Sequence, residues 1–148
     1  GVKNGIFLTD VIGRDAFLAD FNDKYATLFS GVRHDSGDPI EWGEAMIRHY
    51  EKLKINPLTK TLLFSDSLNF EKAIKIKKHF DGRCNIAFGI GTYLAGVQNE
   101  TPLNIVMKIT ECNGLPVCKL TDNPEKAMGI NQDFIDFVKR SINWRINH

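Results

Sequence analysis

The chain contains 148 residues, of which 43% are hydrophobic and 25% are charged, and its formal net charge is +1 at pH 7. This length and this hydrophobic fraction are sufficient for one domain with a buried core. The nearly balanced charge gives no indication of binding to nucleic acid or to a membrane surface, and no apolar run approaches the roughly 20 residues that a membrane-spanning helix needs.

Neither a secretory signal nor a disulfide framework is recognisable. The N-terminus does not show the basic segment and apolar core of a signal peptide. Cys84, Cys112 and Cys118 form an odd number without a C-x-x-C pair. A two-residue Asn-Gly turn after Cys112 would place Leu115 opposite it, which leaves Cys118 out of register. We therefore expect reduced thiols in a cytoplasmic protein and, since the four histidines lack metal-ligand spacing, no metal site.

Short apolar runs alternate with segments of helical periodicity over the first hundred residues. The runs predict strands, and apolar residues three or four positions apart predict the helices between them. One helix has a clear start, because Asp38 is a good N-cap, Pro39 suits the first helical position and Glu41 falls on the third. In chain order we expect a strand at 5–10, a helix at 14–26, a strand at 27–33, a helix at 38–54, a strand at 60–66, a helix at 69–80 and a strand at 85–91.

This alternation predicts an α/β fold with parallel strands, because helices of this length form right-handed crossovers between neighbouring strands. The strands are continuous apolar runs, as in a sheet covered on both faces. After residue 100 the pattern changes to a hairpin at 103–122 around Asn-Gly and an amphipathic helix at 131–144. We interpret 1–148 as a single partial α/β domain, in which 1–100 carry the ligand site and 101–148 form the hairpin and the closing helix.

Polar residues follow each predicted strand at its carboxyl end. In a parallel α/β fold these ends lie on one side of the molecule, where ligands bind. Carboxylates there can accept hydrogen bonds from sugar hydroxyls or hold Mg²⁺ through water, and a glycine loop can expose backbone N–H groups to a phosphate. We therefore expect a site for a phosphorylated sugar. Its candidate residues are Asp10 after the first strand, Arg33, His34, Asp35, Ser36 and Gly37 after the second, Ser65 and Asp66 after the third, and Gly89, Gly91 and Thr92 after the fourth.

Each of these signals also has a purely structural interpretation. An aspartate after a strand is often the N-cap of the next helix, which is the main role expected for Asp38. The segment Gly-Ile-Gly-Thr at 89–92 could serve a turn that needs a positive φ, and Arg33 could form a surface ion pair. Four polar strand ends on one predicted edge favour the ligand site.

At these residues the chain resembles the nicotinate phosphoribosyltransferase family. The matching stretches cover nearly the whole chain in family order. RHDSGDP is the most specific of them, because the related nicotinamide enzyme has proline in place of His34. The resemblance implies the irregular, TIM-like α/β barrel of the type II phosphoribosyltransferases beside a smaller β-rich domain, with about four βα units of the barrel in this chain. The stretches are LTDVIGRDAFLADF, RHDSGDPIEWGE, LLFSDSLNFEKA, FGIGTYL and LNIVMKITECNGLPVCKLTDNPEK.

The resemblance also implies a reaction. Family members join nicotinate to 5-phosphoribosyl 1-pyrophosphate with Mg²⁺, giving nicotinate mononucleotide and pyrophosphate, and ATP hydrolysis drives the reaction through a phosphorylated histidine. By position, Arg33 would contact the pyridine ring or its carboxylate, while Asp35 and Asp66 would hold the ribose hydroxyls and the Mg²⁺-bound pyrophosphate. Asp10 would lie beside the phosphorylated histidine. The 5-phosphate would be held by Gly89, Gly91 and Thr92, with further substrate contacts from His34, Ser36, Gly37 and Ser65.

Part of the family pattern has no counterpart in these residues. The phosphorylated histidine belongs to a segment that would precede residue 1, together with an N-terminal domain. Four strands are about half of an eight-stranded barrel, which leaves open sheet edges and an uncovered interior. We therefore expect the isolated chain to be inactive and able to associate as a homo-oligomer. The histidines that do not match the phosphorylated one are His34, His49, His79 and His148.

Two other interpretations are left open. A nicotinamide or quinolinate phosphoribosyltransferase would share the fold, although the RHDSGDP segment argues against it. A non-catalytic phosphosugar-binding module would bind 5-phosphoribosyl 1-pyrophosphate without turning it over.

Overall fold

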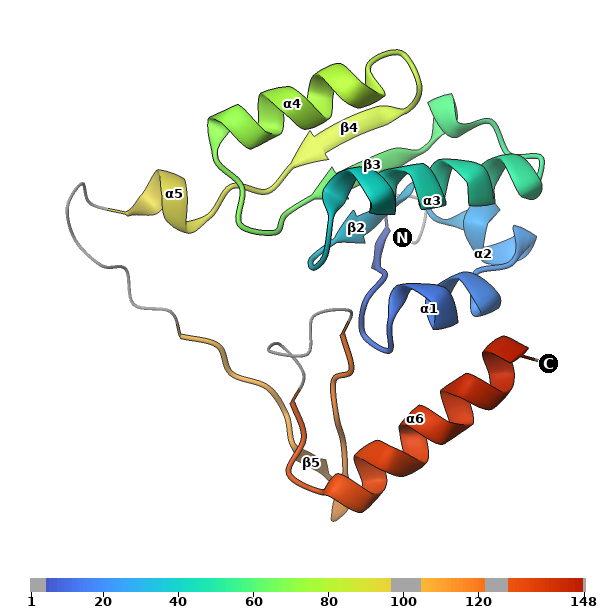
Figure 1. The fold of residues 1–148 in the computed structure, drawn as a ribbon, viewed down its shortest axis with the longest axis vertical. Helices are drawn as coiled ribbons and strands as arrows, with labels where there is room; N and C mark the ends of the chain where they lie inside the picture. The colour runs from blue at the N-terminus through green and yellow to red at the C-terminus, as the bar shows by residue number, and fades with distance from the viewer. Residues whose placement is uncertain (1–4, 97–104, 122–127, 148) are drawn as a thin grey trace.

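The structure, a computed structural model, describes residues 5–96, 105–121 and 128–147. Most of it is a parallel β-sheet with helices between the strands, followed by a small hairpin and a long helix (Figure 1). The strands are β1 (Ile6–Leu8), β2 (Gly31–His34), β3 (Thr61–Phe64), β4 (Asn85–Phe88), β5 (Glu111–Cys112) and β6 (Leu115–Pro116). The helices are α1 (Arg14–Asp20), α2 (Asp23–Leu28), α3 (Pro39–Lys52), the 3₁₀ turn η2 (Pro57–Thr59), α4 (Phe70–Phe80), α5 (Thr92–Ala95) and α6 (Gln132–Asn147).

The four parallel strands lie side by side in the order in which they occur in the chain, β1-β2-β3-β4. Val32 of β2 pairs with Phe7 of β1 on one side and with Leu62 of β3 on the other, and Leu62 pairs in turn with Ile86 of β4. The expected α/β fold with parallel strands is thus confirmed. These strands form an open sheet in the described part of the chain, and the barrel that the resemblance implies stays a prediction.

One face of the sheet carries the hydrophobic core. Val32, Leu62 and Phe64 point to this face and are fully buried. Helices α3 and α4 cover it (Figure 1), and their buried side chains are Trp42, Met46, Ile47, Tyr50, Ala73, Ile76 and Phe80.

The opposite face of the sheet is less covered. Because side chains alternate along a strand, Arg33 lies on this second face, in register with Leu8 and Leu63. Arg33 is exposed, and both leucines remain partly exposed. The expectation of a sheet covered on both faces therefore holds for one face in the described part of the chain.

Side chains cap the two helices that cover the core. Asp38 accepts a hydrogen bond from the backbone N–H of Glu41 at 2.8 Å and begins α3, as predicted. Asn69 caps α4 in the same way. The spacing of Phe70, Ala73, Ile74 and Phe80 predicts that these residues form the inward side of α4. In the structure Ala73 and Phe80 are buried, but Phe70 and Ile74 are each 54% exposed and Ile76 is buried instead.

The first helical region also differs from the prediction. The helix expected at 14–26 is two helices, because Asn22 caps a second one by accepting a hydrogen bond from the backbone N–H of Tyr25 at 3.3 Å. The second helix continues to Leu28, so the strand expected at 27–33 begins only at residue 31.

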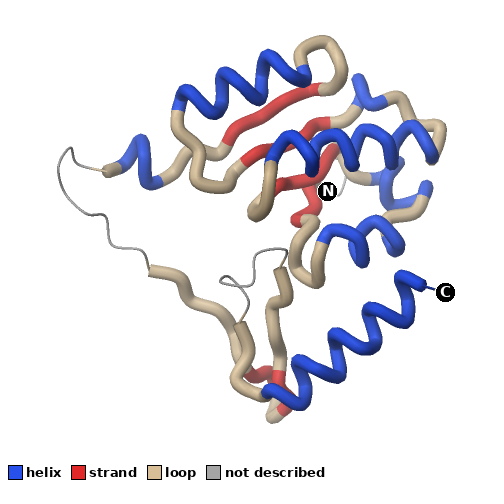
Figure 2. Tube along the Cα trace, in the orientation of Figure 1, coloured by secondary structure: helices blue, strands red, loops and turns tan. Residues whose placement is uncertain are grey.

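The predicted hairpin is present but short. Asn113 and Gly114 both have positive φ, 51° and 74°, as in the two-residue turns that Asn-Gly favours. Cys112 pairs with Leu115, which confirms the predicted register, and the three cysteines are free thiols. Residues 105–110 have no regular secondary structure (Figure 2). Positions 103, 104 and 122 of the expected hairpin lie outside the described residues.

Candidate active site

The carboxyl ends of β1, β2 and β3 bring together most of the polar residues predicted to form a ligand site. They form two hydrogen-bonded groups, one around Asp10 and one around Arg33. Asp10 follows β1, and Arg33 lies near the end of β2.

Asp10 is 1% exposed, and its two carboxylate oxygens have different surroundings. Oδ2 accepts hydrogen bonds from the hydroxyls of Ser36 and Thr121, each at 2.8 Å, and lies 3.4 Å from the ammonium of Lys119. Oδ1 is buried and has no hydrogen-bond partner within the described part of the chain. Asp10 therefore combines one committed oxygen with one that is available to a further donor.

The surroundings of Asp10 favour its ionised form. Burial alone would raise the pKa of this carboxyl, but the hydrogen bonds from Ser36 and Thr121 and the charge of Lys119 outweigh burial. The pKa of Asp10 consequently lies below its ordinary value.

Thr9, the residue before Asp10, anchors the end of β1. Its hydroxyl donates to the carbonyl of Arg33 at 3.1 Å and accepts a hydrogen bond from Nε1 of Trp42 at 2.8 Å. Both Thr9 and Trp42 are buried. The first turn of α3 and the backbone of β2 therefore hold Thr9 in place, and with it the neighbouring Asp10.

Arg33 is held by two side chains on the less covered face of the sheet. Its Nε donates to the hydroxyl of Ser65 at 2.8 Å, and its Nη2 donates to Oδ1 of Asp35 at 3.2 Å. Ser65 in turn donates to the carbonyl of His34 at 2.8 Å. These bonds orient the guanidinium and use two of its five N–H donors, so it can still bind an anionic or aromatic ligand.

His34 lies on the other face of the sheet from Arg33, since neighbouring residues of a strand point to opposite faces. Its ring is 1% exposed, near Trp42 and Phe64. Its Nε2 lies 3.1 Å from the carbonyl of Gly37, which can only accept, so Nε2 carries the proton. This placement argues against the expected direct contact with substrate and favours a role in holding the loop.

Burial lowers the pKa of the His34 imidazole. The negative charges of Asp66, Asp10 and Asp35 act in the opposite direction and offset only part of this effect. His34 is therefore neutral at physiological pH. Its bond to Gly37, which has a φ of 84°, stabilises the turn that carries Asp35 and Ser36.

The ends of β3 and β4 supply the remaining predicted residues. Asp66 is partly exposed and accepts a hydrogen bond from the hydroxyl of Ser67 at 3.1 Å. Gly89 packs closely on Ser65, because a Cβ atom at position 89 would lie 3.1 Å from the Cβ of Ser65. Gly91 and Thr92 begin α5 and are exposed, and a Cβ atom at Gly91 would meet no atom within 4 Å. This edge therefore has room for a ligand.

The sequence interpretation missed two residues of the site, Lys119 and Thr121. The ammonium of Lys119 lies 3.4 Å from Oδ2 of Asp10 and 3.4 Å from Oδ2 of Asp35. Lys119 thereby connects the group around Asp10 with the group around Arg33. The only signal for it in the sequence is the polar–apolar–polar alternation of Lys119, Leu120 and Thr121, which is typical of an extended segment with one buried side.

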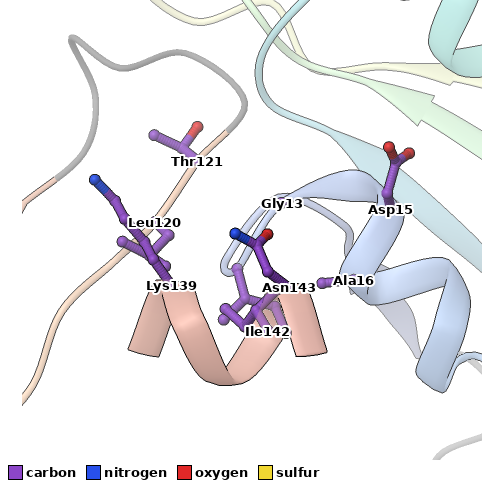
Figure 3. Close-up of a pocket in the computed structure, with 9 residues that line it drawn as sticks. Gly13, Asp15, Ala16, Leu120, Thr121, Lys139, Ile142 and Asn143 are labelled. Carbon is purple, nitrogen blue, oxygen red and sulfur yellow. The ribbon is translucent and has the colours of Figure 1, made fainter. Parts of the chain in front are cut away.

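A pocket of about 350 Å³ lies behind this segment, between α6 and the start of α1. Figure 3 shows that Lys139, Ile142 and Asn143 come from α6, Leu120 and Thr121 from the extended segment, and Gly13, Asp15 and Ala16 from the start of α1. Thr121 also borders this pocket, but Asp10 and Asp35 do not. We therefore assign it to the packing of α6 on α1 rather than to the ligand site.

No group of three or more His, Cys, Asp or Glu side chains is placed to bind a metal ion among the residues that the structure describes. Mg²⁺, however, is often bound through one or two carboxylates together with substrate phosphates. Asp35 and Asp66, the two carboxylates that the resemblance assigns to the Mg²⁺-bound pyrophosphate, are both partly exposed at this edge. In the same described ranges, no helix has both the length and the apolar character needed to cross a bilayer.

The model of the nicotinate phosphoribosyltransferase (NAPRTase) family matches residues 1–145. The chain belongs to the nicotinate phosphoribosyltransferase family. It is 54% identical over 138 residues to nicotinate phosphoribosyltransferase of Proteus mirabilis, covering 93% of this chain and 34% of the relative. It is 53% identical over 136 residues to the enzyme of that name from Acinetobacter baylyi, covering 92% of this chain and 33% of the relative.

Solved structures of the family agree with the fold. The chain is similar to the crystal structure of nicotinate phosphoribosyltransferase from Vibrio cholerae, with a TM-score of 0.88 and 47% identity over 93% of this chain and 35% of that one. A putative nicotinate phosphoribosyltransferase from Saccharomyces cerevisiae gives a TM-score of 0.87 and 38% identity, covering 97% of this chain and 37% of that one. The chain thus spans about a third of the length of its curated relatives.

Proposed function

We propose that the chain is the phosphoribosyl-binding, C-terminal part of an enzyme that joins nicotinate to 5-phosphoribosyl 1-pyrophosphate. The products are nicotinate mononucleotide and pyrophosphate, and ATP hydrolysis drives the reaction. The observation that carries this proposal is the position of Arg33 and Asp35 beside the buried Asp10, at the carboxyl edge of a parallel sheet in a chain of this family.

Arg33 binds the base in this proposal. A guanidinium forms paired hydrogen bonds with a carboxylate and can also stack on an aromatic ring. Ser65 and Asp35 fix its orientation before the substrate arrives, which reduces the entropy lost on binding. Nicotinate carries both a carboxylate and a pyridine ring, so it suits this cation.

The carboxylates act at the sugar. The nitrogen of nicotinate forms a bond to C1 of the ribose while the electron pair of the C1–O bond leaves with pyrophosphate. Positive charge develops on the ribose ring in this step, and the carboxylates of Asp35 and Asp66 stabilise it while they accept hydrogen bonds from the hydroxyls. Ser36 and Gly37 form the backbone turn that fixes Asp35 relative to Arg33, the residue that binds the base.

The 5-phosphate and the pyrophosphate of the substrate need hydrogen-bond donors and a cation. Gly91 and Thr92 provide backbone N–H groups for the 5-phosphate, and Gly91 leaves open space for it. Gly89 contributes by its close packing on Ser65, since its own N–H donates to the carbonyl of Phe64 at 2.8 Å. Asp35 and Asp66 would hold Mg²⁺ together with the pyrophosphate. When bound, this ion neutralises the charge that builds on the leaving pyrophosphate.

Asp10 has a separate role in the proposal. Its unpartnered, buried Oδ1 suits a donor from outside the described residues, and we assign it to the phosphorylated histidine through which ATP is used. That histidine, the N-terminal domain and the other half of an irregular TIM-like barrel belong to the rest of the enzyme. Residues 1–148 form one partial domain of it. We place the enzyme in the cytoplasm, in agreement with its free thiols, and expect a homo-oligomer.

The test uses the full-length protein and a panel of nicotinate, nicotinamide and quinolinate, with formation of the mononucleotide measured by chromatography. We expect turnover with nicotinate and a loss of at least roughly 100-fold in kcat/KM for Asp35→Ala and for Asp66→Ala. The 148-residue chain alone should form no product. Turnover with another pyridine would replace the proposed substrate, and binding of 5-phosphoribosyl 1-pyrophosphate without turnover would indicate a binding module.

A further inference from the structure

Lys119 occupies an unusual position, because it comes from a segment far along the chain and lies between two carboxylates of the site. It is separated by 84 residues from Asp35, yet its ammonium is 3.4 Å from both Asp35 and Asp10. Its side chain is 19% exposed, and that of Asp10 is 2% exposed. A cation at equal distances from two carboxylates in such surroundings restrains both of them.

The backbone around Lys119 holds the side chain in this position. Leu120 forms a parallel bridge with Ile12, just beyond β1, and Lys119 forms an antiparallel bridge with Met128. Both backbone hydrogen bonds of the second bridge are short, at 2.8 and 3.0 Å. The segment 119–121 is thus an extended piece of chain fixed on two sides.

The alternation of side chains divides the contacts of this segment. Leu120 is 8% exposed and lines the pocket between α1 and α6 (Figure 3). The residues before and after Leu120 point to the other side, where Thr121 donates to Oδ2 of Asp10 and lies 3.1 Å from the hydroxyl of Ser36. The segment 119–121 therefore contacts both the hydrophobic side of α6 and the carboxylates of the site.

We propose that Lys119 and Thr121 are positioning residues, which hold the carboxylates of Asp10 and Asp35 in the orientation that the substrate requires. This inference rests on the proposed function for its assay and deepens it. Lys119 orients Asp35 against Arg33, because Asp35 offers Oδ2 to the lysine and Oδ1 to the arginine. Thr121 and Lys119 together bind Oδ2 of Asp10, which leaves its Oδ1 for another donor.

Conservative variants give the inference a specific readout, because Lys119 acts through its charge and Thr121 through its hydroxyl. Lys119→Arg keeps a cation beside the two carboxylates, and Thr121→Ser keeps the hydroxyl that donates to Asp10. A loss of packing would not be restored by keeping only the charge or only the hydroxyl.

The experiment measures kcat/KM and thermal stability for the full-length protein and for five variants. Lys119→Met should lower kcat/KM by roughly 10- to 100-fold, the range typical of residues that orient a functional side chain. Lys119→Arg keeps the charge and should recover most of this loss. Thr121→Val should lower kcat/KM in the same way, whereas Thr121→Ser should keep it close to that of the parent. Lys139→Met, which removes an exposed lysine of α6, should change neither quantity.

The outcomes separate this inference from the proposed function. An inactive full-length protein would refute the proposed function itself. An active one in which Lys119→Met keeps the kcat/KM of the parent, or in which Lys119→Arg loses as much as Lys119→Met, would refute only the positioning role. If circular dichroism shows that Lys119→Met does not fold, the two Thr121 variants decide: an unchanged kcat/KM in Thr121→Val overturns the inference, and a loss in Thr121→Val that Thr121→Ser does not share supports it.

Discussion

The guanidinium of Arg33 and the hydroxyl of Ser65 lie 2.8 Å apart and join the ends of two neighbouring strands. Ser65 uses its own proton on the carbonyl of His34, so it can only accept from Arg33 and holds the guanidinium in one direction. The hydroxyl of Ser65 thus connects the backbone carbonyl of His34 with the guanidinium of Arg33, both of which belong to β2.

Loss of this hydroxyl should affect the binding of the base. In the full-length protein we expect Ser65→Ala to raise the KM for nicotinate by about 3- to 10-fold, the equivalent of one hydrogen bond. Ser30→Ala is the matched control, because Ser30 also donates to a backbone carbonyl but does so at the amino end of the sheet. Equal effects of the two variants on KM would contradict the role assigned to Ser65.

Gly91, which precedes α5, should be needed for binding the phosphate of the substrate rather than for folding. A methyl group at Gly91 meets no atom within 4 Å, so Gly91→Ala should keep the thermal stability. It should raise the KM for 5-phosphoribosyl 1-pyrophosphate roughly tenfold, since the methyl group displaces one charge-assisted hydrogen bond. Gly82→Ala should instead lower the thermal stability and leave this KM unchanged, because Gly82 has a φ of 70° and an alanine there strains the turn. An unchanged KM in Gly91→Ala would remove this residue from the site.

The stability of the protein should depend on pH through His34. Burial lowers its pKa from an ordinary value of 6.5, so the unfolded chain takes up a proton at a higher pH than the folded one. The stabilisation is therefore complete above about pH 6.5 and is lost as the pH falls through the folded-state pKa. Calorimetry of the full-length protein between pH 8 and 5 should show a falling Tm, and His34→Gln should flatten this slope. His79→Gln, at an exposed histidine paired with Glu44, should leave it steep.

The buried lysine before β3 should contribute to stability through backbone carbonyls. Lys60 is 7% exposed, and its ammonium donates to the carbonyl oxygens of Thr27 and Phe29 around the end of α2. Lys60→Met leaves both without their donor, so we expect a loss of about 1–3 kcal/mol in the free energy of unfolding. Urea denaturation measures it, and the exposed Lys78→Met should stay within about 0.5 kcal/mol of the parent. A similarly small change for Lys60→Met would refute this account.

Much of the fold could be predicted because its signals are local. Asp38 and the Asn-Gly turn act on backbone groups within a few residues, and alternating apolar and helical runs determine the parallel arrangement. The break at Asn22 was missed, since Phe17, Phe21 and Tyr25 keep helical spacing across it. The inward side of α4 was also missed, because Ile74 and Ile76 are both apolar and only the position of the neighbouring helix distinguishes them.

The candidate site could be predicted only as far as its residues follow strands. Asp10, Arg33 and Asp35 were found because strand ends converge in any parallel sheet. His34 was placed with them by proximity in sequence, whereas the alternation within β2 turns it into the core. Lys119 and Thr121 depend on contacts over 84 and 111 residues, and no periodicity within a short window contains that information.

The order of the strands has a consequence for how such a chain is made. Each parallel strand pairs with the one before it, so every new strand finds its partner among residues synthesised shortly before, at roughly 5–20 residues per second. The contacts of Thr121 with Asp10 span 111 residues and can form only after the whole sheet has left the ribosome. The scaffold is therefore able to assemble during translation, while the carboxylates acquire their final neighbours in a later, separate event.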